Sequence, residues 1–226
     1  MRKYISTYLF LTLFSQYLLS DSFNYNSYNN HGSVGLINIP TARFYNESIH
    51  GFTLYDGNPD QKITLTSNPF DWMEASFFYT SLQNRPYCYE SYDSVCNQDY
   101  KDKGFNAKFK LRSEDGFLPA VAVGLNDLAG TGLYSSEYIV GSYGLNKIDI
   151  HFGLGWGTLN DNKNNIKNPL TFISDSFKTR PTNIEGKGGQ FQPSRYFSSE
   201  EVAPFFGISY SIKNNILIKF ERDTTS

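Results

Sequence analysis

The chain has few of the residues that most often perform chemistry. Its 226 residues include two cysteines and three histidines, and no Gly-Lys-Ser or Gly-Lys-Thr phosphate loop occurs. Two thiols without a neighbouring histidine make an incomplete zinc site. No histidine stands with a nucleophile at a sharp turn, and no closely spaced carboxylate pair suggests glycan cleavage. We therefore expect a non-enzymatic protein with no cofactor and no catalytic or metal site.

The chain also lacks an excess of charge of one sign and, after residue 20, any long apolar run. Lysine and arginine number 20 against 22 aspartates and glutamates. No basic stripe with interleaved aromatic residues is present, so nucleic acid is not expected as a partner. The mean hydropathy of −0.43 is too polar for a bundle of membrane-spanning helices, and no later segment has the periodicity of an amphipathic helix.

The first twenty residues have the pattern of a secretory signal peptide. Arg2 and Lys3 form a positive start, a largely apolar run follows, and Ser20 or Ser22 offers a small residue for cleavage. A membrane-spanning helix is the alternative, but the run is short and contains several hydroxyl side chains. We expect residues 1–20 to direct export.

Strict alternation is the strongest pattern in the remaining sequence. Residues 148–157 read I-D-I-H-F-G-L-G-W-G, with an apolar residue at every second position and a polar residue or glycine between. This length matches the roughly 9–11 residues that a tilted strand needs to cross a bilayer. The pattern recurs clearly at 73–80, 105–112, 120–125, 206–212 and 216–221, and more weakly at 34–39, 50–55, 62–67 and 136–143.

The predicted fold class is therefore all-β. We expect an antiparallel outer-membrane β-barrel or partial barrel of about nine or ten strands, with an N-terminal signal helix. Residues 21–33 are predicted as a flexible lead-in, and residues 34–222 as the β-barrel domain with a long loop at 158–201. The alternative is a secreted carbohydrate-binding β-sandwich, whose apolar walls would face each other.

Alternation gives each strand one wall toward lipid and one toward the lumen. It places Phe152 toward lipid and Gly153 toward the lumen, so Phe152→Arg should impair insertion whereas Gly153→Ser should be mild. Aromatic residues are expected to form girdles at the membrane interfaces, with stacking on sugar rings as the alternative. The aromatic residues concerned are Trp72, Tyr79, Tyr138 and Trp156.

The polar wall carries the residues best suited to a function. We group them as the polar lumen track, which consists of Lys108, Lys110, Arg112, Asp149, His151, Lys219 and Glu221. One interpretation is a solvated lumen in which acids such as Glu74 balance the cations. The other is a cationic path for an acidic polysaccharide, because charges act strongly inside a narrow channel of low dielectric.

A glycine-containing loop, N-D-L-A-G-T-G-L at 126–133, superficially suggests a phosphate site. It lacks the lysine and hydroxyl residue of a phosphate loop, and no helix pattern follows it. Gly130 and Gly132 permit positive φ, so a turn at Asp127 is the favoured interpretation.

Six short motifs occur in a fixed order along the chain. They are G-L-I-N-I-P-T-A-R-F (35–44), N-P-F-D-W-M-E-A-S-F-F-Y-T (68–80), F-L-P-A-V-A-V-G-L-N-D-L-A-G-T-G-L-Y-S-S-E-Y (117–138), L-G-W-G (154–157), N-P-L (168–170) and P-F-F-G-I-S-Y (204–210). Together they resemble the N-terminal part of the YjbH-like family of bacterial outer-membrane proteins, which is tied to exopolysaccharide and capsule export.

This resemblance implies a non-enzymatic outer-membrane β-barrel component that supports exopolysaccharide or capsule biosynthesis and export. It implies a location in the outer membrane of a Gram-negative bacterium. The implied partners are outer-membrane lipid, a polysaccharide and export machinery, and no catalytic residue is carried over. Because family members are much longer, we expect the chain to be the N-terminal part of a longer protein.

Cys88 and Cys96 generate the first testable prediction. They are close in sequence within a polar segment, and an exported chain reaches an oxidising compartment, so we expect them to form a disulfide. Closing this short loop should stabilise the protein by about 2–3 kcal/mol. Mass spectrometry of non-reduced peptides from exported protein should recover the linked pair, and recovery of both thiols in free form would reject it.

Overall fold

The computed structural model describes residues 26–58, 60–87, 98–160, 165–181, 191–212 and 216–224. The predicted signal peptide and both cysteines lie outside these residues. No helix within the described ranges is long and apolar enough to cross a membrane.

The described part of the chain forms ten strands and three short 3₁₀ helices. The strands are β1 (His50–Asp56), β2 (Asp60–Phe70), β3 (Met73–Tyr87), β4 (Gln98–Arg112), β5 (Ala120–Asn126), β6 (Ser136–Leu145), β7 (Ile148–Gly157), β8 (Ile166–Lys167), β9 (Glu201–Ile212) and β10 (Ile216–Arg222). The 3₁₀ helices η1 (Pro169–Phe172), η2 (Asp175–Phe177) and η3 (Pro193–Arg195) lie between β8 and β9. The all-β prediction is confirmed.

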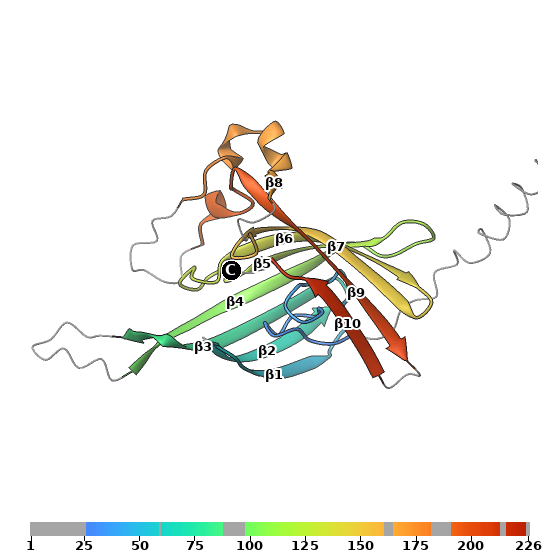
Figure 1. Ribbon diagram of the computed structural model, residues 1–226, viewed down its shortest axis with the longest axis horizontal. Coiled ribbons are helices and arrows are strands. Elements are labelled where there is room, and N and C mark those ends of the chain that lie inside the picture. Colours follow the sequence, from blue (N-terminus) through green and yellow to red (C-terminus); the bar gives the residue numbers. More distant parts are fainter. Residues whose placement is uncertain are drawn as a thin grey trace, which may run out of the picture.

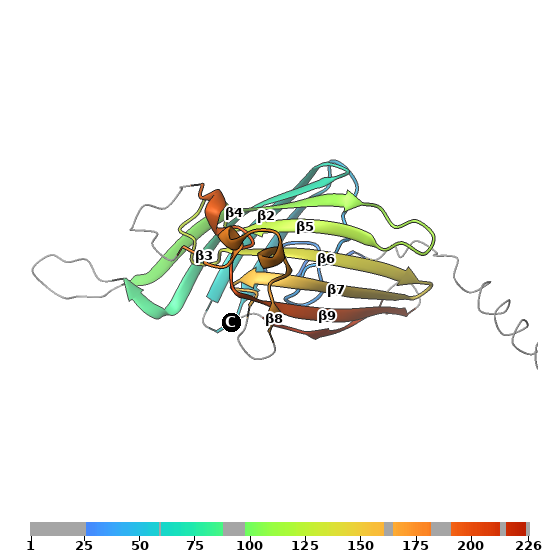
Figure 2. The same ribbon diagram turned by 90° about the horizontal axis from the view of Figure 1, so that it is seen from above.

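The strands form one antiparallel sheet in nearly sequential order. Neighbours follow the path β1-β2-β3-β4-β5-β6-β7-β9-β10, and β8 pairs with the start of β9. Sequential antiparallel pairing is what hairpin connections produce. Figures 1 and 2 show that the sheet is strongly curved, with the N-terminal segment on its concave side.

The sheet is inverted relative to a water-soluble protein, because its polar face is buried and its apolar face is exposed. On β2, Lys62, Thr64 and Thr66 are buried, whereas the intervening Ile63 and Leu65 are 44% and 54% exposed. This follows from the two-residue period of a strand, which sends alternate side chains to opposite faces. The alternation read from the sequence therefore fixes which face is inside.

The exposed apolar residues form a continuous outer wall across paired strands. Leu65 on β2 lies opposite Phe52 on β1 and opposite Phe77 on β3. Phe77 in turn lies opposite Phe105 on β4, with ring centroids 5.2 Å apart. The register thus joins apolar positions into one band around the outside of the sheet.

Residues 26–45, which we call the interior segment, occupy the concave side of the sheet. The segment turns at Gly32, where φ is +79° and an added Cβ would lie 2.4 Å from the Thr64 side chain on β2. Its weak strand prediction at 34–39 is wrong, because these residues form tight turns with isolated bridges, such as Gly35 to Pro40. From residue 26 onward the predicted flexible lead-in is packed inside the sheet.

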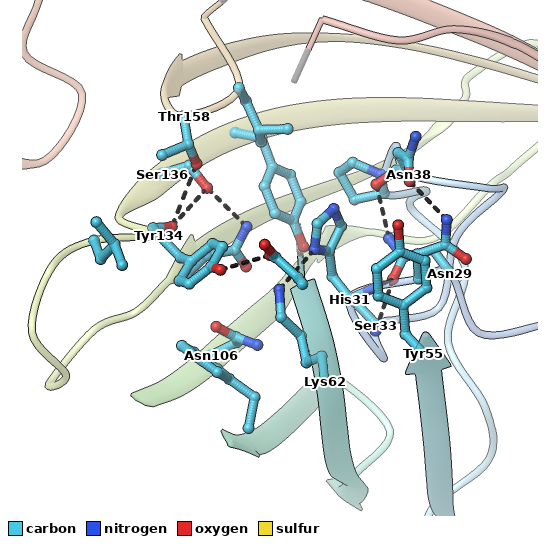
Figure 3. A pocket seen from close by; sticks show the side chains of 18 of the residues that line it. Asn29, His31, Ser33, Asn38, Tyr55, Lys62, Asn106, Tyr134, Ser136 and Thr158 are labelled. Carbon is cyan, nitrogen blue, oxygen red and sulfur yellow. Dashed lines mark hydrogen bonds between the residues drawn. The ribbon is translucent and has the colours of Figure 1, made fainter. Parts of the chain in front are cut away.

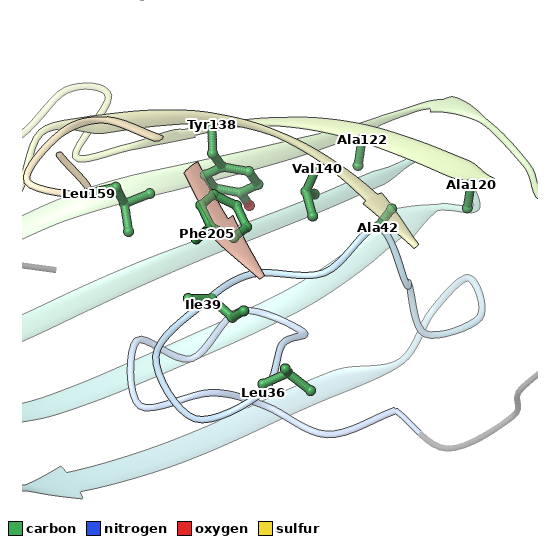
Figure 4. Close-up of a cluster of buried hydrophobic side chains, with 9 residues drawn as sticks. All are labelled: Leu36, Ile39, Ala42, Ala120, Ala122, Tyr138, Val140, Leu159 and Phe205. Atoms are coloured by element: carbon green, nitrogen blue, oxygen red, sulfur yellow. The ribbon is translucent and has the colours of Figure 1, made fainter. Parts of the chain in front are cut away.

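A small apolar cluster holds the interior segment against one part of the sheet (Figure 4). Leu36 and Ile39 come from the segment, whereas Tyr138, Val140 and Phe205 come from the inner faces of β6 and β9. Gly207 on β9 permits the approach, because a Cβ there would lie 2.2 Å from Leu36 Cδ1. The segment therefore docks on the sheet through apolar burial as well as through polar contacts.

The interior segment also connects the two edge strands. In the described part of the chain no pairing joins β1 to β10. Gly51 on β1 closely approaches the ring of Tyr28, while Glu221 on β10 accepts a hydrogen bond from the Asn38 N–H at 2.8 Å. The segment therefore contacts both edges from inside the curve.

The long insert between β7 and β9 covers part of the outer face. Trp156 and Glu137 lie opposite each other on the face away from Tyr138, and both are fully buried. Phe197 packs edge-on against Trp156 at 5.1 Å, and Arg180 forms an ion pair with Glu137 at 2.7 Å. Figure 1 shows the insert on the convex side of β6 and β7.

This arrangement corrects part of the predicted aromatic girdle. Trp72 and Tyr79 are exposed on the outside, with Trp72 stacked on Phe70 at 5.2 Å. Tyr138 faces the interior cluster, and Trp156 is covered by the insert. Neither buried ring is therefore available to lipid. For Trp156 the prediction failed because alternation does not reveal which outer positions another part of the chain covers.

The structure also changes the expectation for Gly153. A Cβ at this position would lie 2.4 Å from the Phe205 ring and 2.6 Å from the Ile139 carbonyl oxygen. Gly153→Ser therefore overpacks the inner face and is not mild.

Candidate functional site in the polar interior

The first electrostatic anchor of the interior segment is the ion pair of Glu74 on β3 with Lys108 on β4. Their charged atoms are 3.2 Å apart, and both side chains are almost fully buried. The Ser33 hydroxyl donates a short hydrogen bond to Glu74, and the Val34 N–H donates another at 3.2 Å. Lys108 donates to the backbone carbonyls of Val34 and Arg43 at 3.2 and 2.9 Å. The pair is thus satisfied by the backbone of the segment.

The second anchor is Arg43, which the interior segment inserts between two carboxylates. Its Nε and Nη2 donate to the two oxygens of Asp149 on β7 at 2.8 and 2.6 Å. Nη2 also lies 2.6 Å from a carboxylate oxygen of Glu114 in the β4–β5 loop. These carboxylates outweigh the desolvation of the guanidinium and raise the pKa of Arg43, so the side chain stays charged.

The third anchor lies on β10, where an acidic and a basic side chain both bind the turn at residues 36–38 of the interior segment. Glu221 accepts from the backbone N–H groups of Ile37 and Asn38 at 2.9 and 2.8 Å. Lys219 donates to the Leu36 carbonyl at 2.6 Å. A turn that presents N–H groups to a carboxylate and a carbonyl to an ammonium is held in one position.

His151 on β7 completes the inner wall beside the second anchor. Its Nδ1 lies 2.8 Å from the Ser142 hydroxyl oxygen, which accepts a hydrogen bond from the Ala42 N–H at 2.9 Å. Asp149 is 3.6 Å from Nε2. These contacts link His151 to the interior segment by hydrogen bonds, and within the described ranges no nucleophile at a sharp turn accompanies it.

The polar lumen track is therefore brought together only in part. Six of its members contact the interior segment or the wall beside it, and these are Lys108, Lys110, Asp149, His151, Lys219 and Glu221. Lys110 lies over the Phe44 ring at 5.1 Å, and Arg112 is exposed and donates to the Pro119 carbonyl at 2.9 Å. Lys108 and Lys110 both lie over the Phe44 ring, whereas Arg112 donates to the Pro119 carbonyl.

A cavity of about 420 Å³ remains beside the interior segment (Figure 3). His31 and Asn30 come from the segment, Lys62 from β2, and Tyr134 from the β5–β6 loop. The volume falls within the range of small-molecule pockets. Sequence reasoning missed this site, because Lys62 reads as one polar residue of a weak strand and the segment was not expected inside the sheet.

The loop that follows β5 is a turn, as predicted. Asp127 and Gly132 have positive φ of 54° and 81°. Gly130 serves close approach instead, because a Cβ there would lie 1.8 Å from Asp127 Oδ1. The Tyr134 N–H donates to Asp127 Oδ2 at 3.1 Å, which closes the loop over the end of the cavity.

The fold and interior define a class of protein: an all-β protein with an inverted, curved antiparallel sheet that is filled by its own N-terminal segment. The chain belongs to the family described as exopolysaccharide biosynthesis protein YbjH, which matches residues 27–226.

One curated relative shows how much of a longer family member this chain covers. The "Uncharacterized lipoprotein YjbH" of Escherichia coli strain K12 is 35% identical over 180 residues, which are 79% of this chain and 25% of that protein. The chain therefore spans about a quarter of the length of that relative. No solved structure gives a significant match.

Removing one partner of the first anchor generates a stability prediction. Glu74→Gln leaves the buried Lys108 ammonium without its carboxylate and should lower the free energy of unfolding by about 3–5 kcal/mol. Guanidinium titration of detergent-refolded protein, read by tryptophan fluorescence, measures the loss.

Asp175→Asn is the matched control, because it breaks an exposed ion pair with Lys178 and should leave stability unchanged. Equal stability of Glu74→Gln and wild type would show that the interior anchor does not hold the fold.

Asp127 generates a prediction on pH. Burial, helped by the charge of Asp102, raises the pKa of Asp127 from 3.8 to about 6. The folded protein thus binds this proton more tightly than the unfolded chain, so stability should fall as pH rises from about 3.8 to 6 and then level off. Asparagine tolerates positive φ and carries no titrating carboxyl group, so Asp127→Asn should remove this part of the pH dependence.

The measurement is a series of unfolding titrations between pH 3.5 and about 8, a window set by these pKa values. Asp99→Asn, on an exposed position of β4, removes the same charge without burial and should keep the wild-type slope. A slope that Asp127→Asn leaves intact would contradict the assignment.

Proposed function

We propose that the chain is a non-enzymatic outer-membrane β-barrel component that supports exopolysaccharide biosynthesis and export in a Gram-negative envelope. The observation that carries the proposal is the inversion of the sheet, with charged groups inside and apolar residues outside. The predicted signal peptide provides the route of export. The name of the E. coli relative, which calls it a lipoprotein, supports an envelope location.

The outer wall is better suited to lipid than to water. Phe52, Phe152 and Phe206 are 50–59% exposed, and Phe152 lies directly opposite Phe206 in the pairing of β7 with β9. A contiguous apolar surface of this kind is rare on soluble monomers and marks a membrane or protein contact. Strands with an apolar outer wall and polar inner wall are the pattern of membrane barrels.

The interior argues against the carbohydrate-binding β-sandwich. A sandwich buries two apolar faces against each other. Here the concave face buries charged side chains such as Glu74, Lys108 and Asp149, and it packs on the interior segment without a second sheet in the described part.

The same anchors bear on how the protein supports export. Movement of a polymer along the described interior requires displacement of residues 26–45, and with it the loss of the Arg43–Asp149 ion pair and of the hydrogen bonds that Glu74, Lys108 and Glu221 make with the segment. Breaking such contacts one partner at a time is costly. We therefore favour a scaffold or docking role in polysaccharide export, with lipid, polysaccharide and export machinery as partners.

Membrane insertion can be tested on the outer wall. Phe152→Arg places a charge on a half-exposed outer position of β7 and should destabilise the inserted state by about 2–4 kcal/mol if the site lies near the midplane. Phe152→Leu keeps the wall apolar and is the control. The readout is the amount of folded chain retained in outer-membrane fractions after an alkaline wash.

Retention of wild type and Phe152→Leu, with loss of Phe152→Arg, is the expected result. Release of the wild-type chain by the wash, or equal retention of all three proteins, would contradict membrane insertion through this wall.

A further inference from the structure

Lys62 differs from three other buried or partly buried cations of the described part of the chain. Lys108, Arg43 and Arg180 each have a carboxylate oxygen within 3.2 Å. No carboxylate oxygen of the described residues lies within 4.0 Å of the Lys62 ammonium, although this side chain is only 5% exposed. Its ammonium instead borders the cavity of about 420 Å³.

Aromatic rings and one imidazole surround the Lys62 ammonium. Nζ lies 4.2 Å from the Tyr134 ring centroid and 5.5 Å from that of Phe78. It also lies 3.3 Å from His31 Nδ1. Burial, followed by the Lys62 charge, lowers the pKa of His31 to about 3, so the imidazole is neutral. Nδ1 therefore accepts from Lys62, and the ring proton is on Nε2.

The cavity offers hydrogen-bond donors and acceptors that the protein leaves open. Asn30 and Asn126 use their amide NH₂ groups on Asn38 and Ser136, which leaves each Oδ1 without a partner among the described residues. His31 Nε2 likewise has no acceptor within the described part. Hydrogen-bond donors and acceptors thus both line this cavity.

Two further side chains that line the cavity, Tyr55 and Asp60, bear on its ligand. Tyr55 on β1 contributes an aromatic ring, and Asp60 accepts a hydrogen bond from the Tyr134 hydroxyl at 2.5 Å. A sugar ring presents hydroxyl groups that both donate and accept, together with an apolar C–H face that stacks on aromatic rings. The cavity has the matching set of groups.

Charge around the cavity decides between neutral and acidic sugars. The negative charges of Asp60, Asp102 and Asp127 all act on Lys62. Three acids around one ammonium make the site unfavourable for a second carboxylate from a ligand. The charges around this cavity therefore favour an uncharged ligand.

We propose that this cavity is a subsite for a neutral saccharide, in which Lys62 and His31 donate to sugar hydroxyls, Asn30, Asn126 and Asp60 accept from them, and Tyr55 stacks on the ring. The proposal rests on the proposed role in exopolysaccharide export and names the substrate class. The apolar lining from Phe78 and Leu82 supports contact with the C–H groups of the ring.

Saturation-transfer NMR on the full chain, refolded in a detergent without a sugar headgroup, tests the proposal. The probes are neutral disaccharides with gluco, galacto, manno and N-acetylglucosamine units, together with digalacturonate as the acidic probe. We expect transfer to at least one neutral disaccharide and at least tenfold weaker binding of digalacturonate.

Lys62→Met keeps the side-chain length and removes the donor, so it should weaken binding of the neutral probe about tenfold. Tyr55→Ala, at the cross-strand neighbour of Lys62 on β1, is a second variant in case Lys62→Met does not refold. Lys110→Met is the matched control, because Lys110 also lies near an aromatic ring but lines a separate cavity. It should bind as wild type does.

Absence of transfer to every neutral probe, preference for digalacturonate, or loss of binding in Lys110→Met but not in refolded Lys62→Met or Tyr55→Ala would each overturn the subsite. The alkaline wash is independent of this test. Retained protein that binds no neutral sugar refutes the subsite alone, and released protein that binds one refutes the membrane role alone.

Discussion

The structure depends on neutralising charges that the inverted sheet buries. An antiparallel sheet with polar side chains on its concave face brings Glu74, Lys108 and Asp149 out of water. Each buried charge without a partner would cost several kcal/mol. Residues 26–45 supply those partners, partly through Arg43 and largely through backbone N–H and carbonyl groups. The interior segment is therefore a structural requirement of the sheet.

The need for the interior segment inside the sheet explains the positions of two glycines, and it bears on the two edge strands. Gly207 admits Leu36 to the inner face of β9, and Gly32 turns the segment beside β2. The segment contacts both β1 and β10, which do not pair with each other in the described part. Lipid leaves no water to satisfy an open edge, so these two strands need pairing partners in a membrane. The interior contacts hold the curvature without providing that pairing.

The features of the fold that could be predicted from the sequence are those that depend on local alternation along a strand. Alternation on 148–157 predicts the strand and its two faces, since side-chain direction on a strand is a local property. It does not predict that Phe197 covers Trp156, because that contact joins residues 41 positions apart across the insert. Residues 34–39 look apolar enough for a strand, yet tertiary contacts with Glu221 and Lys219 bend them into turns. Part of the interior charge was found on the strands, but Arg43 and Lys62 and the partners of the charged groups were not.

The division of the interior also constrains function. Where the segment docks, the charges are satisfied by contacts within the chain, and little binding capacity remains. Beside it, Lys62 and the open oxygens of Asn30 and Asn126 face a cavity. The long β5–β6 loop and the insert lie at this end, while the β2–β3 and β6–β7 connections at the other end are two residues long. Membrane barrels place their longer loops outside the cell and their short turns toward the periplasm. If the chain inserts in that orientation, its binding capacity faces the side on which an exported polysaccharide emerges.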